Sequence, residues 1–348
     1  MPTNHFINRP IPLSALFILT FLLFSFLIQL YVNKNNNFPY IGAISDKLLY
    51  LDRYGKDIDI IFLGSSDYAA SIDPMTLDQE MKQYGCNLRT FNFGVDGLNV
   101  VEFMGIMDQL RKQFSNRRPR LVIGVPAHNY GQEQFSTRSH YFMTWFNLHY
   151  YISDIWNLPR FKTNKIILIY YLLKKYLYEA NNFGVLYNLF FPEDIHMERI
   201  LKQQDARRGY QGYEDKENNA DETKSLEQEV QSFIQQIDTL YNTPYYIEKY
   251  GNGGLNRITP LVNKAKQLEF EIGILFGATL NNYLMSNPSA SLLKNAFPDL
   301  KVWHYNDPKR WPELFQAQNM SNRNHLNFNG SKIFSTFLAP DLCQWMKN

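Results

Sequence analysis

A short apolar run followed by small polar residues limits the fold more than any other feature of this chain. The run is Ile60 to Leu63, with Asp59 before it and Gly64-Ser65-Ser66 after it. Four apolar residues, two of them β-branched, are too few for a helix and are typical of a buried parallel strand. Polar residues 68–73 then lead to a predicted helix from Pro74 through Tyr84, with Asp73 as its N-cap.

Ser66 therefore falls at the carboxyl end of a central strand, where open α/β sheets bind their ligands. A serine in this position is a candidate nucleophile if a histidine can reach it. Small residues at strand ends also commonly serve only as turn formers, and Asp67 and Asp96 beside the motifs are interpreted as turn residues.

Further strands and helices follow in alternation, which predicts right-handed crossovers and a parallel sheet. The predicted strands are residues 87–93, 120–125, 271–276 and 300–303, and the predicted helices are 41–54, 100–114, 225–241, 258–268 and 331–345. We expect a three-layer α/β/α fold with a central parallel sheet of the flavodoxin-like type.

Residues 10–32 contain no charge and about twenty apolar residues, which matches the hydrocarbon thickness of a bilayer. They predict a single transmembrane anchor. A cleaved signal peptide is the alternative, but no small-x-small cleavage site follows. The few basic residues on either side, Arg9 and Lys34 among them, give almost no bias in orientation.

The predicted segments, in chain order, are a short tail (1–9), the anchor (10–32), a linker with an amphipathic helix (33–56), the first part of the α/β domain (57–130), a helical, aromatic-rich insertion or cap (131–257) and the second part of the α/β domain (258–348). Residues 206–225 within the insertion read as a polar loop. The aromatic residues of the insertion suit either cap packing or a sugar-binding surface.

The charge balance and the motifs that are missing from the sequence exclude some functions. The chain has 35 basic and 33 acidic side chains, so its net charge gives no argument for nucleic acid binding. There is no Walker loop, zinc spacing or dinucleotide fingerprint, so we expect no cofactor and no metal. Cys86 and Cys343 are the two cysteines. Two free thiols are the more usual interpretation, and a disulfide would require an oxidising compartment.

A second candidate group lies near the C-terminus, where Asn322, His325 and Gly330 precede an apolar helix. Together with Gly64-Ser65-Ser66 and the stretch Asn92 to Gly97, this pattern resembles the SGNH/GDSL hydrolase superfamily. Within it, the chain resembles the membrane-anchored branch that includes bacterial polysaccharide O-acetylation and teichoic acid D-alanylation proteins. The resemblance covers residues 57–130 and 258–348.

The resemblance assigns the catalytic nucleophile to Ser66 and the catalytic base to His325. Ser65 stands where the common family pattern has Asp, although the D-alanylation branch also has Ser there. The family oxyanion donors fall on the backbone of Ser66 and Gly97. The third donor falls on His128 by spacing or on Asn129 by chemistry.

The residue that orients the histidine is a carboxylate in the family and is Asn322 here. An amide can hold the ring but cannot stabilise imidazolium as a carboxylate does. The chain therefore works as a Ser-His dyad, borrows an acid such as Asp307, or has lost catalysis.

The resemblance implies an esterase or O-acyltransferase that acts on an extracytoplasmic glycan through an acyl-serine, with the soluble domain on the periplasmic side of the cell membrane. The implied partners are the membrane, a surface polysaccharide and a membrane-bound O-acyltransferase. The alternative is a catalytically inactive protein that binds glycan or such a partner.

Overall fold

The structure is a computed structural model that describes residues 43–96, 98, 100–115, 117–125, 204–212, 220–240, 252–280 and 283–347, with a few residues between 16 and 27. The chain divides into two compact units, Met1–Ile41 with Phe146–Glu193, and Gly42–Trp145 with Asp194–Asn348. Nearly all of the described residues belong to the second unit. The predicted anchor lies mostly outside the described residues, as does the predicted insertion up to residue 203. Within the described residues, no helix combines the length and apolar character needed to cross a bilayer.

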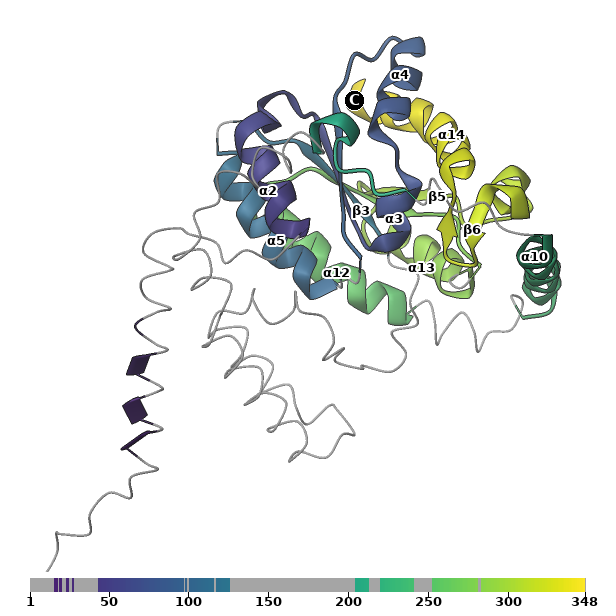
Figure 1. The fold of residues 1–348 in the computed structure, drawn as a ribbon, viewed down its shortest axis with the longest axis horizontal. Coiled ribbons are helices and arrows are strands. Elements are labelled where there is room, and N and C mark those ends of the chain that lie inside the picture. The colour runs from purple at the N-terminus through teal and green to yellow at the C-terminus, as the bar shows by residue number, and fades with distance from the viewer. Residues whose placement is uncertain are drawn as a thin grey trace, which may run out of the picture. The chain divides into compact units, whose positions relative to one another are not determined.

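Five parallel strands form the centre of the second unit (Figure 1). They are β1 (Ile60–Gly64), β2 (Thr90–Gly94), β3 (Arg120–Gly124), β4 (Ile272–Phe276) and β5 (Lys301–His304). Their order, β2-β1-β3-β4-β5, is that of a doubly wound sheet. Segments on both sides of the predicted insertion therefore contribute to one sheet, and the predicted parallel α/β architecture is confirmed.

Helices cover both faces of the sheet (Figure 1). On one side α4 (Pro74–Gln83) packs against α14 (Phe328–Lys347), and on the other α5 (Val100–Gln113) packs against α2 (Ala43–Tyr54) and α12 (Asn252–Gln267), which in turn contacts α13 (Tyr283–Ala296). β1 is buried along its whole length because both of its faces meet helices. Asp73 caps α4 by accepting a hydrogen bond from the backbone N–H of Met75 at 3.2 Å, as the sequence predicts.

Several local predictions are wrong. Residues 66–71 form a short helix, α3 (Ser66–Ser71), where a polar lead-in was expected. The helix α10 (Ala220–Leu240) begins inside the predicted polar loop, α12 begins earlier than predicted, and α13 was not predicted. Both α12 and α13 contain an internal proline, Pro260 and Pro288, which normally argues against a helix interior. Packing between these two helices, and of α13 on β5, overrides that local preference.

A segment of the predicted insertion covers the free edge of β2. The backbone N–H of Asn92 donates to the carbonyl oxygen of Arg208 at 2.9 Å, and that of Gln211 donates to Ala69 at 3.0 Å. Gly209 has φ +83°, and a Cβ there would lie 2.0 Å from the carbonyl oxygen of Asn92. Only glycine fits this close approach. The segment satisfies backbone groups that an exposed edge strand would otherwise leave open.

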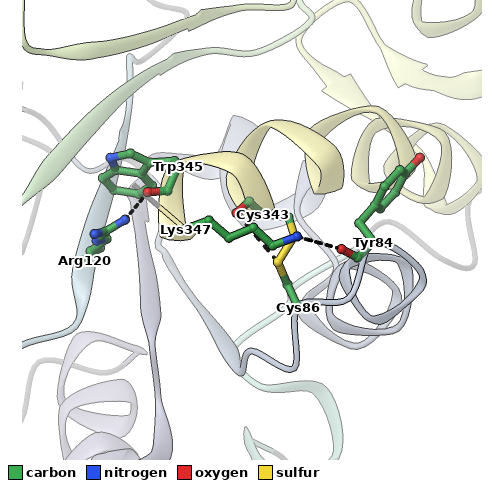
Figure 2. The surroundings of a disulfide bond; sticks show 6 residues. All are labelled: Tyr84, Cys86, Arg120, Cys343, Trp345 and Lys347. Carbon is green, nitrogen blue, oxygen red and sulfur yellow. Dashed lines mark hydrogen bonds between the residues drawn. A yellow bond between two sulfur atoms is a disulfide. The ribbon is translucent and has the colours of Figure 1, made fainter.

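The two cysteines form a disulfide, so the expectation of two free thiols is wrong. Cys86 lies just after α4 and Cys343 lies within α14, with their Cα atoms 5.8 Å apart (Figure 2). Lys347 donates to the carbonyl oxygen of Tyr84 at 3.0 Å beside it. Sequence spacing could not reveal this pair because 257 residues separate the two cysteines, and only the packing of α14 on α4 brings them together.

Candidate active site

Ser66 is the first residue of α3 and directly follows the turn that ends β1. Ser65 precedes it as the N-cap with an extended backbone, φ −82° and ψ −166°. Ser66 exposes only 7% of its surface. Ser66 lies at the carboxyl end of β1, as the strand–turn pattern predicts.

Tyr68 anchors α3 across the carboxyl ends of three strands. Its hydroxyl oxygen lies 2.8 Å from the carbonyl oxygen of Leu275 and 3.0 Å from that of Val125, and it accepts a hydrogen bond from the N–H of Gly277 at 2.9 Å. A Cβ on Gly64 would lie 2.4 Å from the Tyr68 side chain, so this glycine makes room for the ring. Burial raises the pKa of Tyr68 well above its ordinary value, so the hydroxyl keeps its proton.

Asn92 on β2 ties the other end of α3 to the sheet. Its side-chain nitrogen donates to the carbonyl oxygens of Tyr68 at 2.9 Å and Ile72 at 2.7 Å, and its Oδ1 accepts from the N–H of Gly94 at 2.7 Å. Asn92 is fully buried. The amide therefore satisfies carbonyl groups at the end of α3 that no further helical turn can reach, and α3 is held rigidly at both ends.

Lys47 on α2 also holds the carboxyl end of β2. Its Nζ donates to the carbonyl oxygens of Asn92 at 3.0 Å, Gly94 at 2.5 Å and Gly209 at 2.7 Å. Burial lowers the pKa of Lys47 to about 7, and the neighbouring Asp46 carboxylate opposes this shift. The lysine joins α2, β2 and the edge-covering segment, just before the loop that leads to Gly97.

His325 reaches Ser66 from a two-stranded hairpin, β6 (Met320–Asn322) and β7 (His325–Leu326). Its Nε2 lies 3.0 Å from the Ser66 hydroxyl oxygen. The hairpin turn is fixed to the loop after β4, because the N–H of Leu280 donates to the carbonyl oxygen of Arg323 at 2.8 Å. The structure thus brings together the two side chains that the resemblance names as nucleophile and base, 259 residues apart in the chain.

Asn322 sits on the far side of the imidazole ring. Its Oδ1 lies 2.9 Å from His325 Nδ1, and the same oxygen accepts the backbone N–H of Asn324 at 2.9 Å. Because a backbone N–H can only donate, the atom facing it must be the amide oxygen, which fixes the orientation of the amide. The ring then carries its proton on Nδ1 and presents the Nε2 lone pair to the Ser66 hydroxyl. This is the tautomer that a general base needs.

The other predicted site residues are placed as follows. Asp307 lies in the turn after β5, where its Oδ1 accepts the backbone N–H of Lys309 at 3.0 Å and of Arg310 at 3.3 Å. It caps its own turn, while Asn322 holds the contact to Nδ1 of the ring. Gly97, His128 and Asn129 lie outside the described residues.

Asp67 was interpreted as a turn residue, and that interpretation is wrong. It lies within α3, its side chain is 9% exposed, and its Oδ1 is 3.5 Å from His325 Nε2. The only sequence signal for this placement was its position directly after the predicted nucleophile. A sequence cannot show which way the first turn of so short a helix faces.

No family model and no curated protein matches this chain. Among the described residues, no group of three or more His, Cys, Asp or Glu side chains could hold a metal ion. The geometry is thus a buried serine hydroxyl hydrogen-bonded to an oriented imidazole at the carboxyl end of a central strand. In such an arrangement the imidazole is placed to take the hydroxyl proton as the serine oxygen attacks an electrophile.

Proposed function

We propose that this protein is a membrane-anchored serine esterase or O-acyltransferase of the SGNH type, acting on an extracytoplasmic glycan. The observation that carries the proposal is the 3.0 Å contact between Ser66 Oγ and His325 Nε2, with Asn322 fixing the tautomer of the ring. The nucleophile and the base come from opposite ends of the domain and meet at one edge of the sheet, where ligands bind in this class of fold.

In the proposed reaction Ser66 Oγ attacks the carbonyl carbon of an ester while His325 Nε2 takes the hydroxyl proton. The tetrahedral intermediate collapses, and the alcohol leaves with the proton that Nε2 carries. Water or a sugar hydroxyl then attacks the acyl-serine by the same steps, and free serine returns. The predicted oxyanion donors are the N–H groups of Ser66 and Gly97 with the side chain of His128 or Asn129, each worth about 2.7 to 4 kcal/mol.

The location proposed for the domain is the outer face of the membrane. The Cys86–Cys343 disulfide supports it, because disulfides persist in oxidising compartments and are rare in the cytosol. The apolar run at residues 10–32 supports a single-pass anchor. A reporter enzyme that folds only outside the cytoplasm, fused after residue 348, should be active. If this fusion is inactive while a fusion to a reporter that works only in the cytoplasm is active, the proposed orientation is contradicted.

A fluorophosphonate probe tests the chemistry, because it labels only serines with an activating base. The full chain in mild detergent should be labelled, and Ser66→Ala and His325→Ala should abolish the labelling. Ser115→Ala is the matched control, since Ser115 is exposed and precedes β3 at the opposite edge of the sheet. An unlabelled wild-type chain, or labelling that survives Ser66→Ala, rules the enzyme out.

One observation favours a second candidate, a non-catalytic glycan-binding or partner-binding protein. The group behind the imidazole is the neutral Asn322 amide, which leaves an imidazolium without charge compensation at Nδ1. This alternative predicts that binding to glycan, or to a membrane-bound O-acyltransferase, survives both Ser66→Ala and His325→Ala.

A further inference from the structure

A carboxylate faces the imidazole on the side where the proton arrives. Asp67 follows Ser66 on α3, and its Oδ1 lies 3.5 Å from the same Nε2 that faces the serine hydroxyl. Both side chains are largely shielded from water, at 9% and 12% exposure. Solvent therefore screens their interaction weakly.

Among the described residues, the elements packed against the ring bring few other charges. Asp67 is the one charged residue of α3. Arg323, in the hairpin turn, lies 3.9 Å from Glu229 and is more than half exposed. Lys332 on α14 has its Nζ 4.0 Å from the centre of the Phe328 ring.

The contact changes character during the proposed reaction. In the resting state the Nε2 lone pair faces the carboxylate, and 3.5 Å is too long for a hydrogen bond. Once Nε2 takes the proton of Ser66, an N–H bearing positive charge faces the same oxygen and the interaction becomes attractive. An interaction that strengthens only as the transition state forms is the kind that accelerates a reaction.

We infer that Asp67 supplies the negative charge that stabilises the His325 imidazolium, so that the charge compensation lies in front of the ring and the neutral Asn322 only orients it. This inference rests on the proposed serine chemistry. In this inference the proton passes only between Ser66 Oγ, Nε2 and the leaving alcohol, and none passes to Asp67. Asp67 is in this sense a positioning and electrostatic residue that acts through His325.

The test is the kinetics of ester hydrolysis by the full chain in detergent, with p-nitrophenyl acetate as the probe. Asp67→Asn should lower kcat/KM by roughly 10- to 100-fold, the range expected for a lost interaction with a charged group. The acid limb of the pH–kcat/KM profile should also move to lower pH, because a nearby carboxylate favours the charged form of a histidine. Asp299→Asn is the control, since Asp299 is exposed and precedes β5 at the opposite edge of the sheet.

A rescue experiment separates this role from a merely structural one. In the Asp67→Asn background, Asn322→Asp restores a carboxylate behind the ring, and it should recover most of the lost activity. A structural defect in α3 would not respond to a change in the hairpin. If Asp67→Asn does not fold, Asn322→Asp in the wild-type chain decides. A gain in kcat/KM below about 5-fold supports the inference, and a larger gain overturns it, because the imidazolium was then uncompensated in the wild type.

A readout independent of turnover keeps the two proposals apart. The titration of the His325 ring, followed by NMR with labelled histidine, should have a lower midpoint in Asp67→Asn than in the wild type. Fluorophosphonate labelling with unchanged kinetics and titration in Asp67→Asn overturns this inference alone. A chain that is not labelled and does not hydrolyse the ester overturns the proposed function, and the electrostatic role inferred for Asp67 is then also overturned.

Discussion

Breaking the Cys86–Cys343 disulfide should cost this domain a large part of its stability. The bond closes a loop of 257 residues, and the chain-entropy relation gives a restriction of the unfolded state worth about 5.6 kcal/mol at 25 °C. An unfolded chain of this length retains some compactness, which reduces the effect. We expect the free energy of unfolding to fall by about 3 to 5 kcal/mol.

The assay is equilibrium unfolding in urea, followed by tryptophan fluorescence. Trp345 is suited to this, because it is buried on α14 two residues from Cys343 and its ring centre lies 5.2 Å from that of Trp303. Cys86→Ala/Cys343→Ala removes the bond without burying a hydroxyl group. The m-value should rise in this variant, since a chain without the cross-link exposes more surface on unfolding.

The wild-type chain treated with a phosphine reductant is the matched control, because it loses the bond and keeps both sulfur atoms. Reduced wild type and the double variant should lose similar amounts of stability. A loss below about 1 kcal/mol in the reduced wild type would refute the entropic argument. Such a result would mean that the packing of α14 against α4, with the hydrogen bond from Lys347 to Tyr84, persists in the unfolded chain (Figure 2).

Three further changes probe the elements that support the site. Asn322→Ala should lower kcat in ester hydrolysis by about 10- to 1,000-fold with KM unchanged, because the ring loses the acceptor that fixes its tautomer; an unchanged kcat would show that Nδ1 needs no partner. Gly209→Ala should lower the free energy of unfolding by at least about 2 kcal/mol, since φ is +83° and the added Cβ meets a backbone oxygen; urea unfolding measures it, and a loss below 0.5 kcal/mol, roughly the scatter of neutral surface changes, would contradict it. Lys47→Met should flatten the pH dependence of stability between about pH 7 and 9.5. The folded chain releases the Lys47 proton above about pH 7, whereas the unfolded chain holds it to about 10.5, so wild-type stability should rise with pH by at most about 1.4 kcal/mol per unit; equal slopes in the two proteins would contradict the reasoning.

The strands could be predicted because their signal is local. Runs such as Ile60 to Leu63 and Arg120 to Val125 combine apolar, β-branched residues with turn formers at their ends, and buried parallel strands require that pattern. The helices α3 and α13 could not be predicted. The small and polar residues of α3, and Pro288 in α13, favour turns when they are considered in isolation. Contacts with β1, β2 and β5 decide their structure instead.

For the candidate site, too, some features could be predicted from the sequence and others could not. Ser66 and His325 could be paired from sequence through the resemblance to the SGNH/GDSL motifs, and the structure brings the two side chains together at the carboxyl edge of the sheet. The direction of the Asp67 side chain could not be predicted, since it depends on how Tyr68 and Asn92 fix α3 on the sheet. The disulfide could not be predicted either, because it depends on packing between two helices that lie near opposite ends of the domain sequence.

The amide behind the ring and the carboxylate in front of it separate two tasks that a single acid performs in a Ser-His-Asp triad. One task is to fix the tautomer, which Asn322 can do because its Oδ1 orientation is set by the N–H of Asn324. The other is to compensate the imidazolium charge, for which only an ionised group is suited. The two substitutions should then differ in kind. Asn322→Ala should lower the plateau of the pH–rate profile and leave its acid limb in place, whereas Asp67→Asn should move the limb. If both variants move the limb by the same amount, the two tasks are not separate and the ring responds to its surroundings as a whole.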